Sequence, residues 1–154
     1  MVFLKKNFLY ANDMAKAPLE DLFTKEKLEN GKVWEANNFS SGVLLNDGQM
    51  NFSFKPFPAS LQFSSLMDAS QINQDSWVVA GNFYPNNIEL GRYDASFGNI
   101  LSFGKDGKMN SYGLGDLKIK GEVRHIVPVK INGKDCLIFA RNNDSLLITE
   151  IQNN

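Results

Sequence analysis

The sequence has few of the residues that mark a disulfide scaffold, a zinc centre or a membrane span. It contains one cysteine, Cys136, so no disulfide can form within the chain, and one histidine, His125, too few for a histidine-based zinc cluster. No apolar run approaches the roughly 18 residues needed to cross a bilayer. The first apolar residues are soon interrupted by Lys5 and Lys6, which does not match a signal peptide. We therefore expect no membrane span and find no signal peptide in this chain.

The net charge of the chain is also close to zero. Sixteen Lys and Arg balance seventeen Asp and Glu, giving a formal net charge of −1, so no overall field attracts nucleic acid or anionic lipid. No glycine-rich loop leads into a helix, so nucleotide binding has no basis. Locally, residues 105–134 are richer in Lys and Arg and residues 35–104 richer in acids, an asymmetry that could pair surfaces. We expect no nucleic-acid partner and no cofactor.

Turn-forming residues are abundant. Asn, Ser, Gly, Asp and Pro together make up 57 of the 154 residues. A helical bundle would not contain so many residues that break or cap helices. The composition therefore predicts many short strands joined by tight turns.

The order of patterns along the chain agrees with this prediction. Residues 1–32 contain short helical signals, with Thr24 as a cap and Asn30-Gly31 as a stop. From residue 32 onward, strand and turn signals alternate, including an Asp47-Gly48 hairpin turn that tolerates positive φ. We expect strands near 33–36, 42–45, 50–55, 77–80, 97–103, 124–129, 136–140 and 146–151, and a polar loop from Asp68 to Asp75.

The two halves of this β region resemble each other. Residues 41–45 match 97–101, residues 47–51 match 106–110, and residues 78–82 match 138–142, with offsets of 56 to 60. A period near 60 with about four strands is typical of a β-propeller blade; the alternative is a β-sandwich with chance similarity. We predict an all-β fold of antiparallel four-stranded propeller blades, about two in a partial propeller. The expected divisions are an N-terminal segment at 1–32 and blades at 33–90 and 91–154.

The second half also resembles a known family. The runs Ala80–Tyr84, Glu89–Gly98 and Ala140–Asp144 look like the C-terminal blades of FG-GAP/VCBS-type repeat proteins, of the secreted Bacteroidetes kind often given the ASPIC/UnbV-like label. Residues 15–28 resemble the helical insertion before such blades, and residues 52–63 also fit. The resemblance implies a larger propeller in an extracytoplasmic setting (periplasm, cell surface or secreted). Since each blade packs only on its neighbours, it also implies association with remaining blades or self-association.

Four residues form the most informative polar cluster: Glu89, Arg92, Tyr93 and Asp94. Arg92 could pair with Asp94 or with another blade's carboxylate, while Tyr93 offers an aromatic platform. The cluster could therefore line a ligand face. It could instead lock the crossover between blades, which is the interpretation that we favour.

A second polar stretch resembles the calcium loops of FG-GAP repeats, in which oxygen ligands at alternate positions surround the ion. Here only Asp68 supplies a carboxylate at a ligand position. Ser70 replaces an acid and Asp75 is displaced by one position. With Asn73, these residues form a degenerate calcium-type loop, and we expect no metal there.

These patterns favour a non-catalytic binding or scaffold module that presents loops to a protein or glycan partner. The alternative is a fragment of a hydrolase or lyase, with its active site largely on other blades or among Asp68, Asp94 and Glu89. A calcium-stabilised adhesin is a third possibility. A nucleophilic pair of Cys136 and His125 is conceivable, but Cys136 opens an apolar run, where cysteine acts as a small hydrophobe. We predict no catalytic residues.

Overall fold

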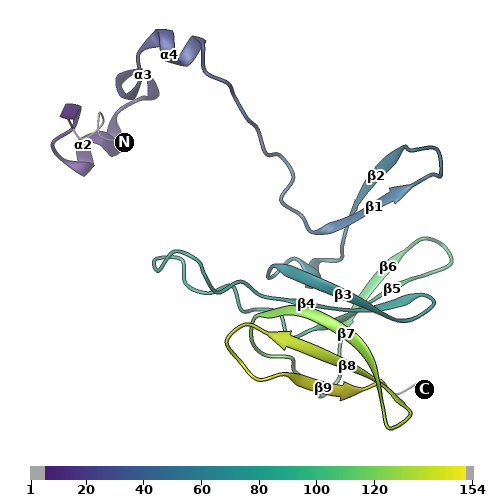
Figure 1. Ribbon diagram of the computed structural model, residues 1–154. Helices are drawn as coiled ribbons and strands as arrows, with labels where there is room; N and C mark the ends of the chain where they lie inside the picture. The colour runs from purple at the N-terminus through teal and green to yellow at the C-terminus, as the bar shows by residue number, and fades with distance from the viewer. Residues whose placement is uncertain (1–5, 152–154) are drawn as a thin grey trace. The chain divides into compact units, whose positions relative to one another are not determined.

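The computed structural model describes residues 6–151 and divides the chain into two compact units, residues 1–38 and 39–154 (Figure 1). Each unit is described by itself. None of the helices among the described residues is long and apolar enough to cross a membrane.

The described residues of the first unit include the short helices α2 (Ala11–Lys16), α3 (Leu19–Leu22) and α4 (Lys25–Glu29). Thr24 and Asn30 stand at the expected N-cap and C-cap positions of α4, but the Thr24 side chain makes no capping hydrogen bond. None of the three helices has a buried residue. The prediction of a strand at 33–36 is wrong. No partner strand pairs with these residues, and the Trp34 side chain, 80% exposed, lies beneath the Lys32 ammonium at 4.1 Å.

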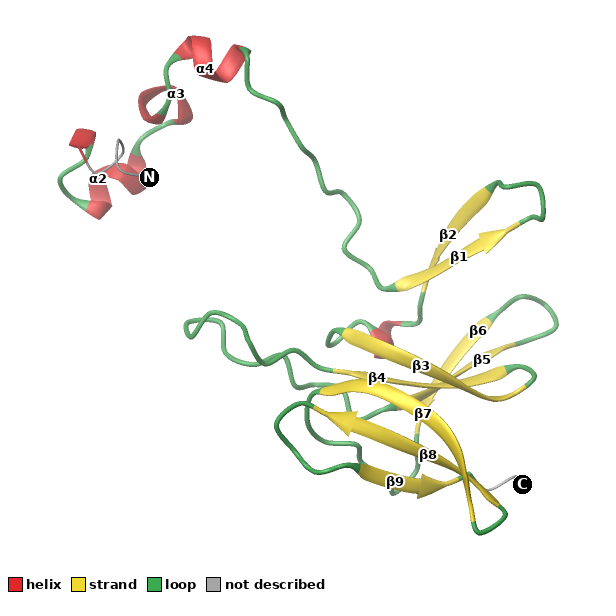
Figure 2. Cartoon of the chain, viewed as in Figure 1, coloured by secondary structure: helices red, strands yellow, loops and turns green. Residues whose placement is uncertain are grey.

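Residues 39–151 of the second unit form nine strands in three antiparallel sheets (Figure 2). A hairpin pairs β1 (Gly42–Asn46) with β2 (Phe52–Pro56). A four-stranded sheet runs in the order β3 (Leu66–Asn73), β4 (Ser76–Gly81), β5 (Asn99–Phe103) and β6 (Met109–Gly113). A three-stranded sheet pairs β7 (Val123–Ile131), β8 (Lys134–Arg141) and β9 (Leu147–Glu150). A single 3-10 turn, Ala59–Leu61, lies between the hairpin and the four-stranded sheet in the sequence.

Strand β4 contributes to both hydrophobic cores of this unit. Side chains alternate between the two faces of a strand. Val78 and Ala80 therefore join one core, with Phe139 and Leu137 of β8. Val79 lies in the other core, with Leu101, and Trp77 packs against it. The four-stranded sheet is thus apolar on both faces.

The three-stranded sheet covers one of these faces. Strand β7 lies beside β3, and the Ile126 amide of β7 donates a hydrogen bond of 2.8 Å to the Asp68 carboxylate of β3. Phe139, Leu137 and Ile126 are almost fully buried and belong to the core that they share with Val78 and Ala80 of β4.

The β1–β2 hairpin covers the other face only in part. Val43 packs against the second core, but five large apolar side chains of the hairpin remain substantially exposed: Leu44, Leu45, Met50, Phe52 and Phe54. A mainly apolar groove of about 740 Å³ lies here, lined among others by Leu45, Met67, Ala69 and Trp77. We call it the apolar groove.

The expected β-rich, antiparallel architecture is confirmed, with a short helical segment before it. Gly48 and Gly107 have the positive φ values, 85° and 73°, that their hairpin turns require. Residues 6–151 contain no closed ring of sheets. The expected boundary at 90/91 falls in the loop between β4 and β5, within the four-stranded sheet.

Truncating Phe139 tests the core between the sheets. Because its side chain is fully buried, Phe139→Ala should lower the free energy of unfolding by about 3–5 kcal/mol through lost burial and a cavity. Phe63→Ala, at a side chain 70% exposed, is the control and should change it by less than about 0.5 kcal/mol. Urea denaturation measures both. Equal losses in the two variants would contradict this placement of the core.

Candidate functional site

The loop at 82–98 connects β4 to β5 and extends beyond the ends of the strands (Figure 1). The corresponding connection from β8 to β9 covers only residues 142–146. The long loop carries all four residues predicted to bind a ligand: Glu89, Arg92, Tyr93 and Asp94.

Asn82 fixes the base of this loop. Its amide nitrogen Nδ2 donates to the carbonyl oxygens of Ser96 and Gly121, both at 2.9 Å, and its Oδ1 accepts the Ser96 amide at 3.0 Å. Its backbone amide donates to the Ser65 carbonyl at 2.8 Å. Asn82 is 1% exposed, so these bonds join the two ends of the loop to neighbouring segments away from water.

Glu122 is the second anchor, and its side chain is completely buried. Arg124 Nη2 lies 2.6 Å from Oε1. The Tyr84 amide donates to the same oxygen at 3.2 Å, and Asn142 Nδ2 donates to Oε2 at 2.7 Å. One carboxylate therefore ties the long loop, the short loop and the start of β7 together.

These partners keep Glu122 ionised. Burial disfavours the charged form, but hydrogen bonds from Asn142 and Tyr84 and the charges of Arg124 and Arg92 outweigh it and lower the pKa of Glu122 below its usual range. The group is therefore an anion at neutral pH.

A polar hollow of about 590 Å³ opens above this anchor. It is lined by Tyr84, Pro85, Arg92, Lys120, Gly121, Glu122, Asn142, Asn143 and Asp144. The guanidinium of Arg92 lies over the Tyr84 ring, 4.7 Å from its centroid, which holds the side chain in a cation–π contact.

The acids of the hollow are already neutralised. Glu122 pairs with Arg124 at 2.6 Å, and Asp144 pairs with Arg141 at 3.0 Å. Within residues 6–151, neither Arg92 nor Lys120 forms an ion pair. The hollow therefore presents two positive charges beyond its internal pairs.

Of the four predicted ligand residues, only Arg92 lines the hollow. Glu89 lies in a turn, where its amide donates to Asn87 Oδ1 at 3.3 Å. Tyr93 exchanges two backbone hydrogen bonds of 2.9 Å with Phe83. Asp94 does not pair with Arg92, whose guanidinium stacks on Tyr84 instead.

The prediction of a polar loop at 68–75 is wrong. Residues 66–73 form β3, and only Gln74 and Asp75 make the turn. Pairing with the apolar β4 holds this stretch extended. Ser70 is buried, the Asp68 carboxylate accepts the amides of Ala69 and Ile126, and the Asn73 side chain accepts the Asp75 amide. Among the described residues, no three His, Cys, Asp or Glu side chains cluster so as to hold a metal ion.

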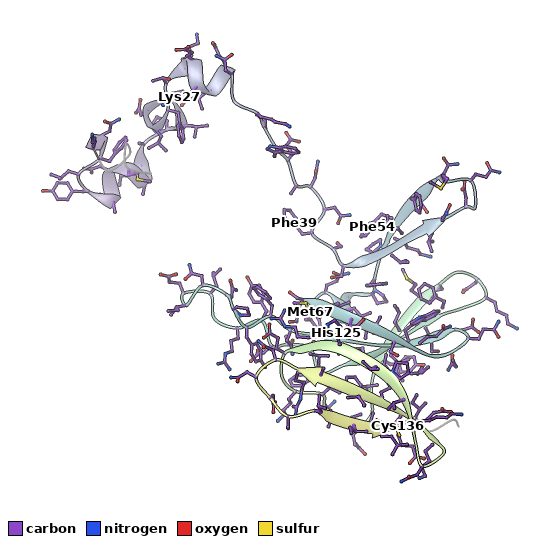
Figure 3. The ribbon with its side chains drawn as sticks, in the orientation of Figure 1. Lys27, Phe39, Phe54, Met67, His125 and Cys136 are labelled. Carbon is purple, nitrogen blue, oxygen red and sulfur yellow. The ribbon has the colours of Figure 1, made fainter. Side chains whose placement is uncertain are left out.

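His125 and Cys136 are not brought together. His125 is paired with Ala140, and Cys136 with Val129, four residues further along β7; Figure 3 shows the two side chains apart. Cys136 is buried. The imidazole Nδ1 of His125 instead lies 3.6 Å from the Asp68 carboxylate.

The sequence alone did not point to Glu122, Tyr84 or Lys120. A usable signal was present for one anchor, because Asn82 and Asn142 fall at matching positions of the two halves. Glu122 had no such signal, since an acid between Gly121 and Val123 reads as an ordinary surface residue before a strand.

The comparisons with known proteins found no similar protein. No family model, curated protein or solved structure matches the chain. Its function must therefore be argued from its own geometry.

Glu122→Gln should weaken the fold, because a buried set of charge-assisted hydrogen bonds loses its anion. We expect a loss of about 1–3 kcal/mol at pH 7. Because the folded pKa is lowered, the stabilisation is present above the usual value of 4.5 and disappears as pH falls through the folded pKa. The variant should therefore lose less stability than the wild type below about pH 4.5. Denaturation at several pH values measures this.

Glu150→Gln is the control for this prediction. Glu150 also pairs with a cation, Lys134, at 2.7 Å, but both side chains are more than 40% exposed. Such pairs contribute about 0–1 kcal/mol. A Glu150→Gln effect as large as that of Glu122→Gln would contradict the anchoring role.

Asn82→Gly tests the clamp at the base of the loop. Glycine tolerates the φ of 97° at this position, so the variant removes only the side-chain hydrogen bonds. We expect faster hydrogen exchange at the Phe83 and Tyr93 amides, and a loss of stability of about 1–3 kcal/mol. Asn87→Gly, on the exposed part of the same loop, should leave these amides nearly unchanged. Unaltered exchange in Asn82→Gly would show that the loop base is held by other contacts.

Proposed function

We propose that the chain is a non-catalytic binding and scaffold module of the FG-GAP/VCBS-like β-propeller kind, acting in an extracytoplasmic setting. Its sheets stack on further sheets of the same type, and the loop at 82–98 presents a ligand-binding hollow to a protein or glycan partner. The observation that carries this proposal is the recurrence of one hydrogen-bonding pattern in two hairpins of different sheets, β3–β4 and β7–β8.

The hairpins β3–β4 and β7–β8 share two details. Each has an irregularity between its first two pairs, Leu66↔Gly81 and Asp68↔Ala80 in one, and Val123↔Arg141 and His125↔Ala140 in the other. In each, an asparagine after the second strand donates its backbone amide, at 2.8 Å, to the carbonyl just before the first strand: Asn82 to Ser65, and Asn142 to Glu122.

The hairpins β1–β2 and β5–β6 also correspond. Each has five residue pairs around a five-residue turn, closed by Asp47 to Asn51 in one and Gly104 to Lys108 in the other. Strand β1 therefore corresponds to β5. Strand β5 pairs with β6 on one edge and with β4 on the other. In the described part of the chain, β1 pairs only with β2, so its other edge has no partner strand.

This correspondence supports a partner at the apolar groove. In the four-stranded sheet, the β5–β6 hairpin is joined by β3 and β4, and both of these strands contact β7 of the next sheet. The β1–β2 hairpin lacks such a pair of strands within residues 6–151, and the groove lies beside it. An antiparallel hairpin with alternating apolar side chains, from remaining blades or a second copy, would pair with β1 and fill the groove.

The electrostatics favour binding over acid–base chemistry in the hollow. A general acid at neutral pH needs a raised pKa, but Glu122 has a lowered one. Asp144 is held by Arg141. Asp68, one of the acids considered for a hydrolase or lyase, accepts backbone amides between two strands. These carboxylates position the loops and strands.

Sedimentation of the whole chain tests the proposal. We expect concentration-dependent association that buries the apolar groove. Ala69→Lys places a charge among the groove-lining residues at an exposed position and should weaken association by at least about tenfold, since burying an unpaired ammonium is costly. Ala95→Lys makes the same change on the exposed loop and should leave association unchanged. A stable, cooperatively folded monomer at all concentrations would overturn the proposal.

A further inference from the structure

We propose that the polar hollow binds an acidic saccharide, with the carboxylate of a hexuronate unit held between Arg92 and Lys120. This inference rests on the proposed binding function and names its ligand class. It goes beyond the residues predicted from the sequence, since only Arg92 was among them.

The sign of the ligand's charge follows from the pairing of the charged groups. Both acids of the hollow are neutralised by arginines, at 2.6 and 3.0 Å. The two remaining charged side chains, Arg92 and Lys120, are both cationic and both line the hollow. An anionic group in the hollow would complete their pairing, whereas a cationic ligand would be repelled by them.

The hollow is built to hold a fixed geometry. Arg92 is positioned by the Tyr84 ring, and the Tyr84 backbone is anchored by buried Glu122. The Lys120 carbonyl accepts a hydrogen bond of 3.0 Å from Arg141, which also binds Asp144 and Ser145. Both cations therefore extend from backbone that is held by buried or multiply bonded groups, and Arg92 is also positioned by its contact with the Tyr84 ring. This limits the backbone ordering needed when a ligand binds.

The other lining groups suit hydroxyls better than a peptide chain. Seven of the nine lining residues have a polar or charged group in the side chain: Tyr84, Arg92, Lys120, Glu122, Asn142, Asn143 and Asp144. Asn143 supplies both a donor and an acceptor. Peptide recognition commonly uses a strand edge or an apolar pocket for side chains, and here Pro85 is the one aliphatic lining residue. The volume of about 590 Å³ lies within the range of small-ligand sites, roughly 300–1,000 Å³.

Calorimetric titration of the whole chain tests this ligand class with three probes of similar length. The probes are trigalacturonate, which is acidic, maltotriose, which is neutral, and triglutamate, which is acidic but a peptide. We expect trigalacturonate to bind at least about tenfold more tightly than either of the others, and its binding to weaken with added salt because the contact is ionic.

Matched variants localise the binding. Lys120→Gln and Arg92→Gln should each weaken trigalacturonate binding by about tenfold, the effect of losing one charge-assisted contact. Lys118→Gln removes the same charge two residues away at an exposed position outside the hollow and should leave binding unchanged. Thermal unfolding of each variant confirms that the fold is intact.

Several results would overturn the inference. They are absence of trigalacturonate binding, equal binding of maltotriose, equal or tighter binding of triglutamate, and equal effects of Lys118→Gln and Lys120→Gln. Failure here is separable from failure of the proposed function, because Ala69→Lys acts on the apolar groove and its effect on association does not involve Arg92 or Lys120. Association without uronate binding would remove the ligand class alone.

Discussion

The structure depends on one constraint: strand β4 is apolar on both faces. Trp77 and Val79 point to one core, and Val78 and Ala80 to the other. A sheet with two apolar faces needs a covering layer on each side. The β7–β9 sheet supplies one layer, and the β1–β2 hairpin supplies part of the other. The apolar groove and the exposed phenylalanines of the hairpin both follow from that incomplete cover.

The polar site depends on the same stacking. Because β3 lies beside β7, the segments before these strands and the loops after β4 and β8 meet at one end of the sheets. Glu122 and Asn82 join these segments through buried hydrogen bonds. A buried polar network of this kind is stabilising only when its members are satisfied, and here each oxygen of Glu122 has a partner. The network holds the base of the long loop in place, so the outer residues of the loop are not needed to fix its position.

In the proposed binding module, the two surfaces have different roles. The apolar groove offers area for a neighbouring sheet, while the polar hollow offers charge and hydrogen bonds to a ligand. Their chemistry differs enough to be tested separately. Glu122 and Asn82 are positioning residues, and their loss should alter both the stability and the hollow.

Local pattern by itself indicated most of the strands, the Asp-Gly hairpin turns and the antiparallel β architecture, because period-two alternation and turn residues act over a few residues. It failed where pairing with a distant strand decides the outcome. Residues 68–73 read as a polar loop but are extended because β4 pairs with them, and residues 33–36 read as a strand but have no partner. Arg92 was predicted from the sequence as a binding residue, but its contact with Tyr84 and its neighbours Lys120 and Glu122 were not predicted. Only the tertiary structure brings these residues together, since they come from segments some 30 residues apart that meet when the sheets stack.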